Sequence, residues 1–248
     1  MKRILYVNGC SHSCGAEISY AGSMRESKDL ELSWAGQMAK RFNLIHYNDA
    51  TSGTGNDAIV STTINSLLTL LDKYRPEEIM VIIGWSSFER TDFIYNNIRY
   101  KFIPGCQELP YFNKWPLIVR NAFDNWIVSI DPYNDSMNKF SLIYYNMVNF
   151  LKIHKLDYYF FNAVVPVNLP STNLLHELTN HRPNMRLFNF IKNDANYLDP
   201  FNIDMTYYHY LKSRYDGHID NRNHHFLQDA HQEWCSILTE QIKGKFNI

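Results

Sequence analysis

The sequence predicts an α/β fold, a three-layer α/β/α sandwich with a central parallel sheet and two insertions. Short apolar runs without polar alternation recur along the chain, a pattern typical of strands buried on both faces of a parallel sheet. Segments with apolar residues at helical spacing separate these runs, as the crossover connections of a parallel sheet require. With 248 residues, the chain is long enough for a domain with a core of its own.

The first half of the chain alternates strands and helices in this prediction. Apolar runs that end in Asn or Gly predict strands at Ile4–Val7, Leu44–Tyr47 and Ile79–Ile83. A helix capped by Ser33 is expected to run through Arg41. A longer helix is expected over Asp57–Tyr74, where a following proline ends it.

The second half contains both insertions. An aromatic-rich insertion covers about residues 86–156 and closes with a helix from about Ser136 to Lys155, and a polar, lid-like insertion covers about residues 171–216. A strand is expected at Asp157–Val165, and a final helix at about Gln228–Lys243. The aromatic side chains are expected to form a second hydrophobic layer over the sheet and one wall of a substrate cleft. The whole chain, residues 1–248, is expected to be a single domain.

Charge and composition exclude several classes of partner. Lys and Arg number 24 against 25 Asp and Glu, and a net charge of −1 offers no field that would attract nucleic acid or an anionic membrane. The apolar run at the N-terminus ends after Val7, too early for a secretion signal, and no run is long enough to span a membrane. We therefore expect a cytoplasmic protein whose four cysteines are reduced thiols.

Small and polar residues follow the expected strands, at the sheet edge where ligands bind in open α/β sheets. The three strands of the first half lead into Gly9-Cys10-Ser11, Asn48-Asp49-Ala50-Thr51-Ser52-Gly53 and Gly84-Trp85-Ser86. Near the C-terminus, His225 precedes the expected final helix and His231 lies on it. A serine, N–H donors at glycines and a histidine are the groups that acyl transfer needs.

These motifs resemble, in the same order along the chain, the sequence blocks of the SGNH (GDSL-like) hydrolase family. The resemblance implies a flavodoxin-like sandwich of the SGNH type and a serine esterase that needs no metal or organic cofactor. It makes Ser11 the nucleophile and His225 the general base. The N–H groups of Ser11 and Gly53, together with the Ser86 hydroxyl, would form the oxyanion hole.

The residue that would orient the histidine departs from the family pattern. The family has an aspartate three positions before the histidine, and this chain has Arg222 there. Asp220 is expected to take that role, with Asn223, Asp216 or a backbone carbonyl as alternatives. His224 is the substitute base if the register differs by one residue.

A second departure lies after the third strand, where Ser86 stands in place of the family's asparagine. The shorter serine side chain weakens one oxyanion donor, and loss of such a donor costs about 10²–10³ in rate. Nearby, Glu17 and Arg90 either form a charged pair at the cleft mouth or are solvated loop residues.

Together these observations predict an esterase that hydrolyses a small O-acyl group, in the simplest case O-acetyl, on a carbohydrate or metabolite. The alternative is a catalytically degenerate protein that keeps the fold for binding or structure. The Asn- and Tyr-rich composition resembles that of proteins from large bacteriophages, which would place the protein in the host cytoplasm or the virion. The sequence carries no prediction for the number of subunits.

Overall fold

A central parallel sheet organises the structure, a computed structural model that describes residues 2–18, 27–109, 111–129, 135–167, 185–215 and 225–246. The sheet has the strand order β2-β1-β3-β6. Its strands are β1 (Ile4–Gly9), β2 (Ile45–Asn48), β3 (Ile79–Trp85) and β6 (Asp157–Asn162). All neighbouring pairs are parallel, so the four carboxyl ends lie at one edge.

The strands β1, β3 and β6 contribute side chains to two separate cores, which explains their uninterrupted apolar runs. In β3, Val81 and Ile83 belong to the core on one face of the sheet, whereas Met80 and Ile82 belong to the core on the other. Successive side chains of a strand point to opposite faces, so burial on both faces leaves no position for a polar residue. Burial is confirmed for β1, β3 and β6 but not for β2, which lies at the edge of the sheet and leaves Ile45 46% and Tyr47 40% exposed.

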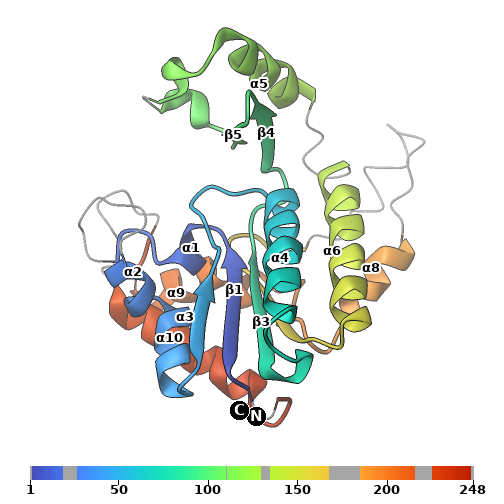
Figure 1. The fold of residues 1–248 in the computed structure, drawn as a ribbon. Helices are drawn as coiled ribbons and strands as arrows, with labels where there is room; N and C mark the ends of the chain where they lie inside the picture. Colours follow the sequence, from blue (N-terminus) through green and yellow to red (C-terminus); the bar gives the residue numbers. More distant parts are fainter. Residues whose placement is uncertain are drawn as a thin grey trace.

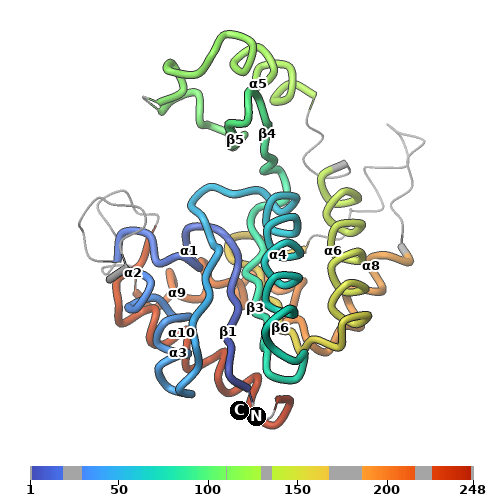
Figure 2. Tube along the Cα trace, viewed as in Figure 1, coloured from blue at the N-terminus to red at the C-terminus, as the bar shows by residue number. Residues whose placement is uncertain are grey.

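Helices cover both faces of the sheet (Figure 1 and Figure 2). One face carries α4 (Asn56–Leu71), α6 (Asp135–Ile153) and α8 (Met185–Lys192). The other carries α3 (Trp34–Arg41), α9 (Tyr207–Tyr215) and α10 (Gln228–Ile242). The three-layer α/β class is therefore confirmed. Among the described residues, no helix combines the length and the apolar character needed to cross a membrane.

Both predicted insertions contribute helices to these layers. The helix α6 closes the segment predicted as an aromatic-rich insertion, yet it packs against α4 and α8 in one of the two cores. The helices α8 and α9 fall within the predicted lid-like segment and pack against α6 and α10, respectively. These helices fill the outer layers of the sandwich because the sheet would otherwise expose apolar side chains on both faces.

The strand β6 is shorter than predicted. Its register pairs Asn162 with Trp85, the last residue of β3, and the expected continuation to Val165 has no neighbouring strand to pair with. On its outer edge, Phe160 exchanges backbone hydrogen bonds with the segment 196–198: Phe160 N–H donates to Asn196 O (2.8 Å) and Leu198 N–H donates to Phe160 O (2.9 Å). This bridge shields the edge of the sheet.

Residues 91–129 form a hairpin–helix segment that projects beyond the carboxyl ends of the strands (Figure 1). It contains the antiparallel strands β4 (Thr91–Tyr95) and β5 (Ile98–Phe102), and the helix α5 (Leu117–Ser129). The turn residues Asn96 and Asn97 have φ angles of 50° and 61°, as a tight hairpin turn requires. The sequence analysis did not predict this hairpin.

The aromatic residues of this segment pack on one another. Phe102, Phe112 and Phe123 are buried in a cluster that also includes Trp115 and Trp126. The expected second hydrophobic layer over the sheet is therefore wrong, because the rings form a separate small core within the projecting segment. Aromatic side chains bury large areas each, which lets a segment of this length hold its own core.

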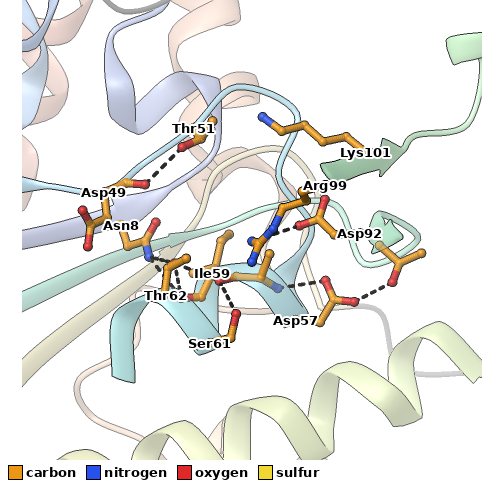
Figure 3. Close-up of polar contacts among 12 residues, drawn as sticks. Asn8, Asp49, Thr51, Asp57, Ile59, Ser61, Thr62, Asp92, Arg99 and Lys101 are labelled. Atoms are coloured by element: carbon orange, nitrogen blue, oxygen red, sulfur yellow. Dashed lines mark hydrogen bonds and ion pairs between the residues drawn. The ribbon is translucent and has the colours of Figure 1, made fainter. Parts of the chain in front are cut away.

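A polar joint connects the hairpin to the sandwich. Asp57, in the first turn of α4, accepts hydrogen bonds from Thr91 Oγ1 (2.5 Å) and Lys139 Nζ (3.3 Å). Beside it, the Asp92 side chain is 5% exposed and one carboxylate oxygen lies 3.6 Å from Nη1 of Arg99 on the paired strand (Figure 3). Burial raises the pKa of Asp92 to about 6, and the nearby charge of Asp57 adds to the increase.

We predict that Asp92→Asn stabilises the protein at neutral pH. The folded pKa of about 6 exceeds the ordinary value of 3.8, so ionised Asp92 opposes folding above pH 6 and the penalty disappears as pH falls toward 4. The variant should gain about 1–3 kcal/mol at pH 7.5 and little near pH 4, measured by urea unfolding at both pH values. The exposed Asp72→Asn is the control, and an equal gain at both pH values would contradict the prediction.

Candidate active site

Ser11 lies at the carboxyl end of β1, as the first residue of the short helix α1 (Ser11–Cys14). The chain turns directly from strand to helix at Gly9, whose φ is 153°. A Cβ on Gly9 would lie 2.5 Å from Ser13 Oγ and 2.7 Å from Gly84 O, so only glycine fits between the helix and β3. Ser11 is 7% exposed at this edge of the sheet.

The loop that contains Gly53 is tied to the same edge. Asn48 Nδ2 donates to Ser13 O (3.0 Å), and Thr51 N–H donates to Gly9 O (3.1 Å). Gly53 has a φ of 74°, a conformation that favours glycine. A Cβ there would lie 2.8 Å from Ile103 Cδ1, so the end of the hairpin closes over this glycine.

Ser86 follows β3 and is held by one side chain of α4. Its N–H donates to Asn56 Oδ1 (2.9 Å), and Asn56 Nδ2 donates back to Ser86 O (3.1 Å). The Ser86 hydroxyl oxygen accepts a hydrogen bond from Arg90 Nη1 (3.1 Å). Because Arg90 is always a donor, the hydroxyl proton of Ser86 remains available to another acceptor.

His225 pairs with Glu17. Its Nδ1 lies 2.6 Å from Glu17 Oε2, and the two side chains are only 14% and 11% exposed. The ring of His225 lies 5.3 Å, centroid to centroid, from the ring of His12, the residue after Ser11. The structure thus brings a histidine–carboxylate pair next to the helix that carries Ser11.

Glu17 corrects one sequence-based alternative. The sequence offers Arg90 as a partner for Glu17, but the Glu17 carboxylate contacts His225, and Arg90 contacts Ser86 instead. The expected orienting residue Asp220, its alternatives Asn223 and Asp216, and the substitute base His224 all lie outside the described residues. Sequence spacing could not identify Glu17, because it lies 208 positions from the histidine it contacts.

The backbone at Glu17 is strained in a way that fits a positioning role. Its φ of 66° lies in the left-handed region, which non-glycine residues rarely adopt. The helix α1 ends just before it at Gly15, whose φ is 68°. Such conformations cluster at functional sites, where the surrounding structure compensates for the strain.

A buried layer supports α1 from the side of α3 and α10. Trp34 Nε1 donates to His12 O (3.1 Å), and Trp34 N–H donates to His231 Nδ1 (3.2 Å). Tyr207 OH lies 3.0 Å from His231 Nε2. His231 is 1% exposed and lies on the final helix as expected, where it acts as a buried structural histidine.

The comparisons with known proteins agree with this architecture. A family model described as a family of unknown function, DUF6071, matches residues 16–181. A solved structure from Desulfitobacterium hafniense DCB-2, assigned to the lipolytic G-D-S-L family, is 11% identical with a TM-score of 0.51 over 97% of this chain and 99% of that chain. The structure of TesA is 10% identical with a TM-score of 0.50 over 97% and 98% of the two chains.

A Bacillus subtilis protein is 11% identical with a TM-score of 0.51, over 99% of this chain and 57% of that chain. No curated protein matches the chain. At these identities the likeness concerns the fold alone, which this chain shares with the G-D-S-L family protein and with TesA. The sequence-based prediction of the fold is therefore confirmed.

We predict that His231 stays neutral across the pH range in which most histidines titrate. Burial, together with the nearby His225, lowers its pKa to about 3. The Trp34 N–H bond to Nδ1 places the ring proton on Nε2, toward Tyr207. Long-range ¹H–¹⁵N NMR spectra should show the neutral Nε2–H tautomer from pH 8 to pH 4.5, whereas the urea-unfolded protein should titrate near ~6.5. A folded-state midpoint near pH 6 would contradict this.

Proposed function

The chain belongs to DUF6071, a family of unknown function, and we propose that it is a serine ester hydrolase with Ser11 as its nucleophile. The observation that carries the proposal is the contact between His225 Nδ1 and Glu17 Oε2, placed beside the helix that begins at Ser11. A serine, a histidine and a buried carboxylate that contacts the histidine have the composition of a catalytic triad.

In the proposed reaction, Ser11 Oγ attacks the carbonyl carbon of the ester while His225 Nε2 takes the hydroxyl proton. His225 then gives this proton to the departing alcohol, which leaves an acyl group on Ser11. Water repeats the sequence, releases the acid and restores the serine. Glu17 accepts a hydrogen bond from Nδ1–H, which leaves the lone pair on Nε2, the nitrogen that acts as the base in this proposal.

The negative charge on the carbonyl oxygen needs hydrogen-bond donors. The proposed donors are the N–H groups of Ser11 and Gly53 and the hydroxyl of Ser86. Arg90 supports this role of Ser86, because a hydroxyl oxygen that accepts from a guanidinium becomes a stronger donor. The arginine thereby offsets part of what is lost when serine stands in place of asparagine.

The proposed substrates are small O-acyl esters, in the simplest case O-acetyl esters, of a carbohydrate or metabolite. A non-catalytic binding protein of the same fold is the second candidate. The observation that favours it is Ser86, which stands where SGNH hydrolases have an asparagine. The two candidates differ in one measurable property, which is whether Ser11 is activated.

Covalent labelling tests this activation. Intact-mass analysis after incubation with a fluorophosphonate probe should show a single adduct on the native chain, and none on Ser11→Ala or His225→Ala. Ser61→Ala is the control, because this serine is exposed on α4 and its loss should leave labelling intact. Absence of an adduct on the folded native chain would refute the esterase and favour the binding protein.

Variants of the carboxylate test the role of Glu17. Glu17→Gln should lower kcat for 4-nitrophenyl acetate by about 10²–10⁴, because an amide no longer fixes the imidazole in the reactive tautomer. Glu17→Asp should retain more activity, and the exposed Glu31→Gln should change nothing. Asp220→Asn is the competing variant: if it abolishes activity while Glu17→Gln does not, Asp220 is the orienting residue.

A further inference from the structure

A cleft of about 470 Å³ opens beside Ser86, between the sandwich and the hairpin–helix segment. Its polar lining comes from the loop after β3, and its apolar lining comes from the projecting segment and the loop after β6. The lining residues are Ser87, Glu89, Arg90, Ile103, Pro104, Ile127 and Val165. This volume lies within the range of small-molecule sites.

The cleft adjoins the candidate oxyanion donors on two sides. Arg90 lines it and donates to Ser86 Oγ, while Ile103 lines it and covers Gly53. A group bound in the cleft therefore lies next to an ester held at Ser86 and Gly53. The expected aromatic wall is wrong for this cleft, because its lining residues from the projecting segment are aliphatic and the rings pack inside that segment.

Among the described residues, Arg90 uses little of its hydrogen-bonding capacity. A guanidinium has five N–H donors, and the one side-chain acceptor that the described residues give it is Ser86 Oγ. In the same part of the chain, no ion pair joins an Asp or Glu to this half-buried side chain. Its backbone is fixed, because Arg90 O lies only 2.8 Å from where a Cβ on Gly55 would be.

We propose that the cleft binds an anionic group of the ester substrate, a carboxylate or a group of similar charge, through Arg90. The inference rests on the proposed function, and it assigns the substrate class for the same site. The guanidinium supplies two parallel donors of the kind that carboxylates accept. Ile103, Ile127 and Val165 contact the hydrocarbon between the anion and the ester.

Glu89 lines the same cleft and opposes an anion. It provides an internal test, because the Arg90 assignment requires that removal of this charge favours an anionic ester. If Glu89 were the binding group instead, the native cleft would prefer neutral or cationic esters, and Glu89→Gln would abolish that preference.

The kinetic experiment compares esters of matched length with and without the charge. On the acyl side the pair is mono-4-nitrophenyl glutarate and 4-nitrophenyl pentanoate, and on the alcohol side 3-acetoxybenzoate and phenyl acetate, each corrected for the rate with Ser11→Ala. We expect the native chain to prefer the anionic member of at least one pair by about tenfold or more in kcat/KM. The preference should disappear in Arg90→Met, persist in part in Arg90→Lys and increase in Glu89→Gln.

The preference is the ratio of kcat/KM for the anionic ester to that for the neutral ester, measured in one variant. If Arg90→Met also weakens Ser86, both rates fall equally and the ratio does not change. Equal kcat/KM values for both members of both pairs, or a preference that Arg90→Met retains, would overturn the inference while leaving the esterase in place.

A binding measurement keeps the inference testable if no ester is hydrolysed. In Ser11→Ala protein with ¹³C-labelled isoleucine methyl groups, monomethyl glutarate should shift the signals of Ile103 and Ile127, and methyl pentanoate should not at the same concentration. The shifts should vanish in the double variant that adds Arg90→Met. If these shifts occur but no ester is hydrolysed, the esterase proposal is refuted and anion binding in the cleft is retained. Equal shifts with both esters would refute anion binding in the cleft.

Discussion

The close approach of α1 to the ends of β1 and β3 is the constraint on which the candidate site depends. Gly9 and Gly84 are register partners in the sheet, and Ser13 Oγ lies directly over both. A Cβ on Gly84 would lie 2.7 Å from this oxygen and 2.6 Å from Phe161, so neither glycine has room for a side chain. This packing fixes Ser11 at the sheet edge and directs the chain from Gly15 into Glu17, the partner of His225.

The loop that follows β2 has two roles that the structure couples. It places Gly53 at the sheet edge, and its neighbour Gly55 packs against the backbone at Arg90 and Thr91, where the hairpin begins. The charged joint of Asp57, Asp92 and Arg99 lies at the same place. The hairpin–helix segment is therefore attached to the loop that holds one proposed oxyanion donor. Ile103, just after the hairpin, both covers Gly53 and lines the cleft.

Most of the fold can be predicted from local sequence patterns. The buried strands follow from their apolar runs, and α3 begins after Ser33, whose hydroxyl accepts from Gly36 N–H at 3.1 Å as an N-cap should. The positions of Ser11, Gly53 and Ser86 at strand ends were also predicted, although their roles remain proposals. The hairpin at Asn96 and the contact between Glu17 and His225 were missed, since a polar turn has weak periodicity and a contact across 208 positions depends on the tertiary structure.

The separation of Glu17 and His225 along the chain has a consequence during protein synthesis. Ribosomes add about 5–20 residues per second, so roughly 10–40 seconds pass between the emergence of Glu17 and that of His225, 208 positions later. On the proposed mechanism, Ser11 has no base during this interval and cannot attack an ester. On the same mechanism, each molecule acquires reactivity only when folding brings His225 into contact with Glu17.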